Sequence, residues 1–352
     1  MLDLPPVLDV LERILDRLAF RRNVRGRVWR ITADLLASGM DLQRALPLVA
    51  DISGRSGRGR LGGILGKLRA ALRTDRFAAT VAGYVPEAEA LLFARFGMAD
   101  DARLFQSAAR VVAVETRIAA AIRQALAWPA FLFILIFVLL FGLGTTLFPT
   151  LETLAPIRQW PLLSQLVGRA AFTVAGNAPV FGVGLVVGFG AYKWAESHYI
   201  GPGRVWLDRI PPFSLYRIRT GATFAFVLIE NARVGHEINR AFLDGVAASV
   251  PPYSRSRIQA IAALAERTSI GGAAVAAGHG FPDPELNAVL RAYAGQADWV
   301  ERYGGYADAW LERLQEKIDA VLQLLRLGLM VLAAVIIGSA AWVMVNVSSL
   351  VS

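Results

Sequence analysis

The segment Ser53–Lys67 carries glycines, serines and a terminal lysine from which a phosphate-binding loop could be built. Such a loop needs a glycine five residues before its Gly-Lys pair and a hydroxyl residue directly after it, because backbone amides cradle the phosphates and the hydroxyl binds magnesium. Leu61 and Leu68 occupy those two positions. Ser56 also fails as the nucleophile of a glycine-flanked turn, because Arg58 replaces the second glycine. The sequence therefore argues against nucleotide binding and against serine hydrolase chemistry here.

The other side chains that could take part in catalysis or bind a metal are isolated from one another. His198, His236 and His279 lie far from one another and from acidic pairs at ligand spacing, so we expect surface or interface histidines rather than metal ligands. Asp100 and Asp101 would point about 100° apart on a helix, so a helix start, where negative charge is favourable, explains them better than a carboxylate pair. The chain has no cysteine, which excludes disulfides and thiolate metal sites. We therefore predict a protein that is not an enzyme and has no cofactor and no metal.

Three long uncharged stretches separate the charged parts of the chain. They are residues 124–151, 170–192 and 327–352. A helix needs roughly 20 apolar residues to cross a bilayer, and each stretch is long enough. Asn177 and Pro179 interrupt the second stretch, so a kinked or re-entrant segment is the alternative to a straight span there. Because no ionisable residue lies within the stretches, an ion or proton pathway is not expected.

Basic residues gather at one end of each predicted span. They are Arg110, Arg117 and Arg123 before the first span, Lys193, Arg204 and Arg209 after the second, and Arg313, Lys317 and Arg326 before the third. The positive-inside rule then predicts a cytoplasmic N-terminus and a C-terminus on the opposite side of the membrane.

These features predict an all-α, polytopic membrane protein with three transmembrane helices and two cytoplasmic helical-bundle domains. The predicted divisions are an amphipathic helix (1–24), domain 1 (25–128), the first transmembrane helix (129–149), a periplasmic loop (150–170), the second transmembrane helix (171–193), a cytoplasmic linker (194–220), domain 2 (221–324), the third transmembrane helix (325–347) and a periplasmic tail (348–352). The amphipathic helix either packs on its own domain or binds the membrane surface or a partner. Each domain is about 100 residues, enough for its own core.

The two cytoplasmic domains share one sequence register. A shift of 196 residues aligns them without a gap across two windows and also lays the first predicted transmembrane helix on the third, which predicts an internal repeat. The shift superposes Gly39 on Gly235, Leu42 on Ile238, Ala45 on Ala241, Pro86 on Pro282 and Glu89 on Glu285.

Glycine marks the second predicted span as a helix that packs closely against another helix. Gly184 and Gly188 form a G-x-x-x-G motif, which allows two helix backbones to approach in lipid. The contact is either within the chain or between copies in a homo-oligomer, and the sequence leaves both open.

Two motifs recur in the predicted repeat. A leucine-rich helix with a glycine turn occurs at Leu35–Leu46 and, more loosely, at Asn231–Phe242. A proline-led helix start occurs at Val85–Glu89 and Phe281–Glu285, and Ala125–Ala130 is an aromatic-proline entry into the membrane. With the repeated architecture, these motifs make the chain resemble the type II secretion system F family, the inner-membrane platform proteins of type II secretion systems and type IV pili. It is most similar to the divergent members of type IVb and thin pili.

The resemblance implies a mechanical function in the bacterial inner membrane. A platform protein couples a cytoplasmic assembly ATPase to the extraction of pilins or pseudopilins and to fibre assembly, together with other inner-membrane assembly proteins and the lipid bilayer; nucleic acid is not an expected partner. Phe96–Asp101 and Tyr293–Ala297 depart from the Gly-Glu and Ser-Gly pattern of the family, which leaves open whether its acidic or metal-binding role applies. A small polytopic transporter, or a membrane scaffold unrelated to pili, is the alternative function.

Basic charge favours the first domain as the contact for the ATPase. Residues 1–128 contain 20 Lys and Arg against 13 Asp and Glu, whereas residues 193–326 contain 15 against 14. Arg55, Arg58 and Arg60 concentrate this charge in a glycine- and serine-rich turn, where it would attract an acidic partner. A solubilising or lipid-facing loop is the alternative for the same turn.

Overall fold

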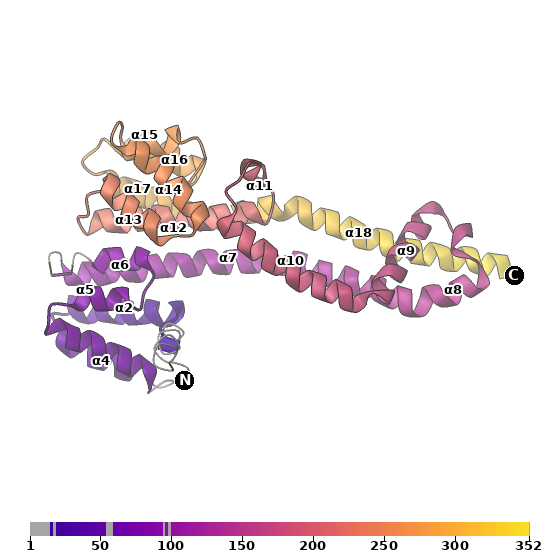
Figure 1. The fold of residues 1–352 in the computed structure, drawn as a ribbon, viewed down its shortest axis with the longest axis horizontal. Coiled ribbons are helices and arrows are strands. Elements are labelled where there is room, and N and C mark those ends of the chain that lie inside the picture. Colours follow the sequence, from indigo (N-terminus) through magenta and orange to yellow (C-terminus); the bar gives the residue numbers. More distant parts are fainter. Residues whose placement is uncertain (1–14, 17–18, 54–58, 94–95, 98–99, 352) are drawn as a thin grey trace, which may run out of the picture. The chain divides into compact units, whose positions relative to one another are not determined.

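The computed structural model describes residues 15–16, 19–53, 59–93, 96–97 and 100–351. Every regular element within these ranges is a helix, so the predicted all-α fold class is confirmed for this part of the chain. The chain divides into two compact units. We call residues 1–119 with 197–312 the polar unit, and residues 120–196 with 313–352 the apolar unit; Figure 1 labels their helices.

The N-terminal half of the polar unit, its described residues up to 119, is a set of short helices followed by the start of a long one. These are α2 (Arg22–Ala37), α3 (Leu42–Ser53), α4 (Arg60–Leu72), α5 (Phe77–Ala82), α6 (Glu87–Phe93) and the first part of α7 (Asp101–Gly142). The sequence dictates one buried face per helix: on α3, Leu42, Ala45, Leu46 and Val49 recur at the three- and four-residue spacing of a helix and are all buried.

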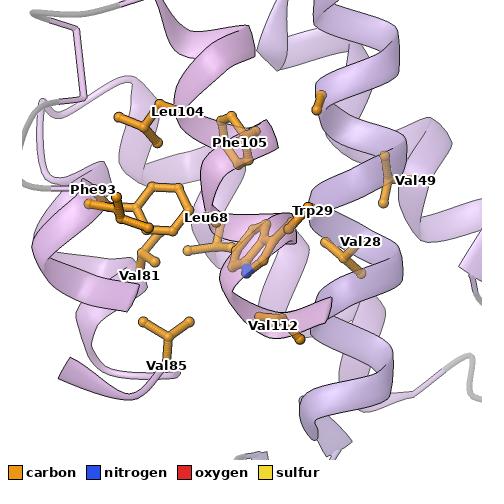
Figure 2. Close-up of a cluster of buried hydrophobic side chains, with 14 of the residues drawn as sticks. Val28, Trp29, Val49, Leu68, Val81, Val85, Phe93, Leu104, Phe105 and Val112 are labelled. Carbon is orange, nitrogen blue, oxygen red and sulfur yellow. The ribbon is translucent and has the colours of Figure 1, made fainter. Parts of the chain in front are cut away.

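The core of this half is centred on Trp29 of α2. The Trp29 ring lies 5.0 Å from Phe93 of α6 and 5.6 Å from Phe105 of α7, measured between ring centroids. Figure 2 shows the indole among Leu68, Phe93 and Phe105, so side chains from α2, α4, α6 and α7 meet at one point. Large aromatic rings contribute most of the buried apolar area in such a core, and here they join the start of α7 to the short helices.

The C-terminal half of the polar unit, residues 197–312, has a comparable series of helices. They are α11 (Arg204–Leu207), α12 (Phe213–Arg233), α13 (Arg240–Ser249), α14 (Pro252–Ala265), α15 (Ile270–Ala276), α16 (Pro284–Tyr293) and α17 (Trp299–Glu312). Side chains cap several of their first turns: Asn239 accepts a hydrogen bond from the Phe242 amide, Ser269 from Gly272, and Asp283 from the amides of Glu285 and Leu286.

The two halves pack on each other within the polar unit. Helix α6 of the N-terminal half lies against α12 and α13 of the C-terminal half. Val227 and Val234 of α12 belong to the hydrophobic cluster around Trp29, and Leu91 of α6 packs on the cluster of the C-terminal half. The predicted cytoplasmic domains therefore contribute to one compact unit rather than to two separated bundles.

The apolar unit contains the helices that could cross a membrane. Besides the remainder of α7, it comprises the π-helix η2 (Leu143–Leu147), α8 (Phe148–Leu154), the 3-10 helix η3 (Ile157–Gln159), α9 (Leu162–Gly176), α10 (Ala178–His198) and α18 (Leu314–Val351). By length and composition, three helical stretches in the described part of the chain can span a bilayer: Asp101–Leu154, Ala178–His198 and Leu314–Asn346. The break between α9 and α10 falls at Asn177, two residues before Pro179.

Close helix packing in the apolar unit occurs at Gly144 of η2. A Cβ placed on Gly144 would overlap the carbonyl oxygen of Ala171 on α9, so glycine permits the two backbones to touch. The ends of α8 and α9 also pack with α18, where the Ser164 hydroxyl donates to the Ser339 carbonyl at 3.3 Å. Figure 1 shows α8, α9 and the C-terminal part of α18 grouped together.

Candidate functional site

The predicted basic turn is only partly within the described residues. Arg55 and Arg58 lie outside them. Arg60 is the first residue of α4, and its guanidinium lies 3.5 Å from the Asp16 carboxylate. Lys67, the lysine of the rejected phosphate loop, lies inside α4, and its ammonium is also 3.5 Å from Asp16. Both basic side chains are about half exposed, so such pairs contribute little stability and leave the charge accessible to water.

The Asp100-Asp101 pair has the helix-start role expected from the sequence. The Asp100 carboxylate accepts hydrogen bonds from the amides of Ala102 and Arg103, at 3.0 and 3.4 Å, and so caps α7. Asp101 instead accepts from the Gly97 amide at 3.2 Å, and burial raises the pKa of Asp101. The two carboxylates accept hydrogen bonds from different backbone amides and so point in different directions, as expected for neighbours on a helix.

The residues paired by the 196-residue register fall into similar turns. Gly39 and Gly235 both have positive φ, +86° and +83°, and each follows the end of a long helix. In both turns the residue after the glycine, Met40 or His236, donates its amide to a carbonyl five residues earlier. The side chains are less alike.

Burial differs between several of these paired positions. Ala45 is fully buried whereas Ala241 is exposed, and Pro86 is exposed whereas Pro282 is buried. Leu42 is buried and Ile238 is partly buried. The register thus relates the two glycine turns more closely than it relates the other paired positions.

Glu89 is the centre of a buried ion pair in the N-terminal half. The Arg25 guanidinium donates to both carboxylate oxygens of Glu89, with Nη2 2.6 Å and Nε 3.0 Å from them, and the Trp29 indole donates at 3.2 Å. Arg25 also donates to the Phe20 carbonyl at 3.2 Å. The Glu89 side chain is 1% exposed. Burial raises the pKa of Glu89, while Arg25 opposes that rise by favouring the charged form.

Glu285, the predicted counterpart of Glu89, has a different partner. Its carboxylate accepts a hydrogen bond from the Tyr306 hydroxyl on α17. Extending the 196-residue shift to Arg25 leads to Gly221, where a Cβ would overlap the carbonyl oxygen of Pro282. The C-terminal half therefore fills this place with backbone where the N-terminal half has an ion pair.

Arg110 of α7 joins three helices of the polar unit. Its guanidinium lies 3.3 Å from Glu230 on α12 and also pairs with Asp308 on α17. Arg233, one turn after Glu230, lies 2.6 Å from the same carboxylate. Glu230 is 1% exposed, and burial raises its pKa against the opposing effect of the two arginines. We call Arg110, Glu230, Arg233 and Asp308 the α7 cluster.

A polar cavity of about 400 Å³ adjoins the α7 cluster. Its lining is Arg103, Gln106, Ser107, Arg110, Glu230, Arg233, Val234 and Glu301. Opposite charges face one another across it, and its lining has no cysteine, histidine or lysine. The arrangement brings the Ser107 hydroxyl into a hydrogen bond with the Glu230 carboxylate and holds together the helices that line the cavity.

In the sequence, Arg110 stands out only as part of the basic flank of the first span. Arg110 is nevertheless the sole charged residue between Arg103 and Glu115, in a run of mainly small and apolar residues. A lone charge within a buried helix face predicts an oppositely charged partner. That signal was present, but the partners lie 120 and 198 positions further along the chain.

A second buried cluster, also missed, surrounds Asp208. Arg204 and Tyr253 donate to its two carboxylate oxygens at 2.9 and 3.0 Å, and Arg257 lies 3.5 Å away. Burial raises the pKa of Tyr253 to about 12. The nearby His279 has a pKa lowered chiefly by burial and secondarily by Arg257.

The predicted glycine motif of the second span does not pack within the described residues. A Cβ on Gly184 or Gly188 would meet no heavy atom within 4 Å. The alternative, a contact between copies of the chain, stays a prediction. No group of three or more His, Asp or Glu side chains in the described ranges could hold a metal ion.

Comparison of the chain with protein-family models, with curated proteins and with solved structures gives no match.

Proposed function

We propose that this chain is an inner-membrane platform protein of a type IV pilus or type II secretion machine. It couples a cytoplasmic assembly ATPase to the extraction of pilins or pseudopilins and to fibre assembly. In this role the polar unit receives motion from the ATPase, and the spans of the apolar unit transmit it to subunits in the bilayer. No covalent chemistry of the chain's own is required.

The observation that carries this proposal is the continuity of α7. One helix runs without a break from Asp101 to Gly142. Its first turns are held in the polar unit by Asp100 capping, by the Phe105 contacts and by the ion pairs of Arg110. Its later turns form the most apolar of the candidate spans. A continuous helix clamped at one end by buried charges can carry a displacement along its axis, and Pro129 is the one position of α7 whose residue cannot donate a backbone hydrogen bond.

The internal repeat is part of the proposal, and the helix ends support it. Helices α2 and α12 end at Ala37 and Arg233, and α3 and α13 end at Ser53 and Ser249. Each pair of ends is separated by the predicted 196 residues. The matching glycine turns after α2 and α12 support the same register.

The proposed topology places the polar unit in the cytoplasm, the N-terminus inside and the C-terminus in the periplasm. It rests on the basic flanks of the spans. A reporter that is active only outside the cytoplasm should work when fused after Ser352 or near Leu154, and should fail at Gly235. Activity at Gly235 would contradict the topology.

The decisive test of function combines gene deletion with an insertion that uncouples α7. In the host organism, deletion of the gene should abolish fibres or secretion, and the wild-type chain should restore them. A four-residue Gly-Ser insertion between Ala120 and Ala121 should leave membrane insertion and ATPase binding intact but should not restore fibres, because it breaks the rigid helix. The same insertion between Ala297 and Asp298, in an exposed turn before α17, is the control and should restore fibres. Normal fibres and secretion after deletion would refute the platform function.

The basic turn gives a narrower test of the ATPase contact. Replacing Arg55, Arg58 and Arg60 by Glu should weaken salt-sensitive binding of the ATPase encoded beside this gene, with unchanged helix content and membrane insertion. Binding that is unchanged and independent of salt would remove this turn from the interface. The alternative transporter function predicts instead that proteoliposomes containing the chain accumulate a solute, with no dependence on the ATPase.

A further inference from the structure

A short, outward-facing apolar surface lies directly after α10, at residues 205–210. Val205, Trp206 and Ile210 are exposed, with Trp206 at 70%, and Arg209 is exposed beside them. Val205 with Arg209, and Trp206 with Ile210, are four residues apart, so α11 and the turn that follows it present them on adjoining faces. We call Val205, Trp206, Arg209 and Ile210 the α11 surface.

The opposite face of α11 is locked into the polar unit. Arg204 and Asp208 are only 2% and 3% exposed and pair with each other at 2.9 Å. Asp208 also accepts from Tyr253 of α14, and the Arg204 guanidinium lies 4.1 Å from the centre of the Tyr253 ring. A buried ion pair stacked on an aromatic ring fixes the orientation of α11. The exposed apolar side chains are therefore held outward by a rigid support.

The charge of this surface is positive. In residues 199–212 the charged side chains are Arg204, Asp208 and Arg209, and Asp208 is buried against Arg204 and Arg257. The charge that reaches the surface is Arg209, whose guanidinium lies 5.2 Å from the centre of the Trp206 ring. Tryptophan favours the boundary between lipid tails and headgroups, and arginine binds phosphate groups there. This chemistry fits an anionic lipid surface better than an acidic or a wholly apolar protein surface.

Chain length places the α11 surface near the end of a candidate span. Helix α10 ends at His198 and α11 begins at Arg204. Six residues reach at most about 20 Å even when fully extended. Tyr199 shortens this reach further, because its hydroxyl donates to the Pro202 carbonyl at 2.6 Å and closes a compact turn. If α10 crosses the bilayer, this short connection keeps α11 within reach of the headgroup layer.

We propose that the α11 surface is an interfacial membrane anchor. Val205, Trp206 and Ile210 enter the boundary of the lipid tails, and Arg209 binds the phosphates of anionic lipids. The anchor holds the polar unit against the membrane at the segment where α10 leaves it. This inference requires that α10 spans a membrane, but it does not depend on a role in pili or secretion.

The absence of native cysteine allows a direct measurement of depth. The full-length variant Trp206→Cys, labelled with a nitroxide, is placed in nanodiscs of phosphatidylglycerol and phosphatidylcholine. Collision with oxygen, which concentrates in the bilayer, is compared with collision with a water-soluble nickel complex. The matched control is Ile52→Cys on α3, an apolar position that is also exposed. Val205→Cys is a second labelling site in case Trp206→Cys fails to fold.

The anchor predicts a higher oxygen-to-nickel collision ratio at positions 206 and 205 than at position 52. The ratio at position 205 should fall when Arg209→Gln is added or when phosphatidylglycerol is omitted, because phosphate contacts then weaken. Labels as accessible to nickel as the position 52 label would overturn the proposal. Labels shielded from both reagents would also overturn it, because they would show that protein rather than lipid covers the surface.

Discussion

The N-terminal and C-terminal halves of the polar unit match at the ends of α2 and α12 and of α3 and α13, but their interiors differ. In the N-terminal half the centre holds the Arg25–Glu89 ion pair beneath Trp29. In the C-terminal half the corresponding place is Gly221, and the backbone at Pro282 approaches so closely that no Cβ would fit. At these two positions the N-terminal half is held by buried charges and the C-terminal half by a close backbone contact.

A second contrast concerns the acidic residue one turn before each glycine turn. Asp34 is exposed, whereas its predicted counterpart Glu230 is buried and pairs with Arg110 and Arg233. The C-terminal half therefore contacts α7 through the ion pair of Glu230 with Arg110, whereas the corresponding residue of the N-terminal half, Asp34, is exposed. In the proposed repeat, the ends of α2 and α12 and of α3 and α13 match, while the contacts around them differ. The contacts that differ lie inside each half, as at Arg25 and Gly221, and also between the halves, as at Arg110 and Glu230.

The largest expected effect is from Arg25→Ala. It leaves the Glu89 carboxylate buried without its cation, and breaking a buried pair in this way costs about 3–5 kcal/mol. Native-state hydrogen exchange, measured by mass spectrometry on the full chain in nanodiscs, should show faster opening of α2 and α6 and a smaller change in α14 and α15. Arg22→Ala is the matched control, because the Arg22 contacts, a pair with the Glu115 carboxylate at 3.6 Å and a hydrogen bond to the Glu115 carbonyl at 3.3 Å, are partly exposed; it should change opening by less than about 1 kcal/mol. Equal effects of both variants would show that the buried Arg25–Glu89 pair stabilises this half no more than a partly exposed pair does.

The next effect is expected at the corresponding place in the C-terminal half. Gly221→Ala forces α12 away from Pro282, and such overpacking costs about 1–3 kcal/mol. The exchange of α12 and α16 should accelerate. Gly305→Ala on α17 is the control: a Cβ there would meet no neighbour, so the substitution should be neutral or stabilising, as alanine favours a helix over glycine. A Gly221→Ala variant as stable as Gly305→Ala would contradict the close approach.

The sequence predicted the regular features of the fold better than its contacts. Helical periodicity gave the all-α class, and uncharged length located the apolar helices, because both signals are local. The Asp100 cap was likewise readable from a few residues. The break before α10 was anticipated by Asn177 and Pro179, although a straight span was the primary expectation.

Local sequence patterns did not predict the contacts between residues that are far apart in the chain. Arg25 and Glu89 are 64 positions apart, and Arg110 and Asp308 are 198 apart. Periodicity tells which face of a helix is buried but not which helix covers it. Gly144 shows the same limit: the sequence singled out Gly184 and Gly188, while close approach within the apolar unit occurs at a glycine that has no G-x-x-x-G spacing to reveal it.

The glycine turns should respond alike in the two halves. Gly39→Ala and Gly235→Ala each place a Cβ on a residue with positive φ, which costs about 1–2 kcal/mol. Hydrogen exchange should report similar destabilisation of the helix pairs flanking each turn, α2 with α3 and α12 with α13. Gly62→Ala, at an ordinary helical position with open space around it, is the control. Clearly unequal effects of Gly39→Ala and Gly235→Ala would weaken the proposed repeat at the feature where the halves agree best.

The smallest effect is a pH dependence that belongs to the N-terminal ion pair. Burial raises the pKa of Glu89 above its ordinary value of 4.5, so the native state binds more protons than the unfolded state between 4.5 and the raised value. The stability contributed by Glu89 is therefore complete below pH 4.5 and is lost as the pH rises through the raised pKa.

Glu89→Gln cannot titrate and keeps an acceptor for Arg25 and Trp29. Thermal unfolding followed by tryptophan fluorescence should then show the wild-type midpoint falling relative to that of Glu89→Gln as the pH rises. Glu230→Gln should behave in the same direction, since burial also raises the pKa of Glu230. A midpoint difference between wild type and Glu89→Gln that stays constant from pH 4.5 to neutrality would mean that Arg25 compensates fully for burial. The buried ion pair would then give the N-terminal half no pH-dependent stability.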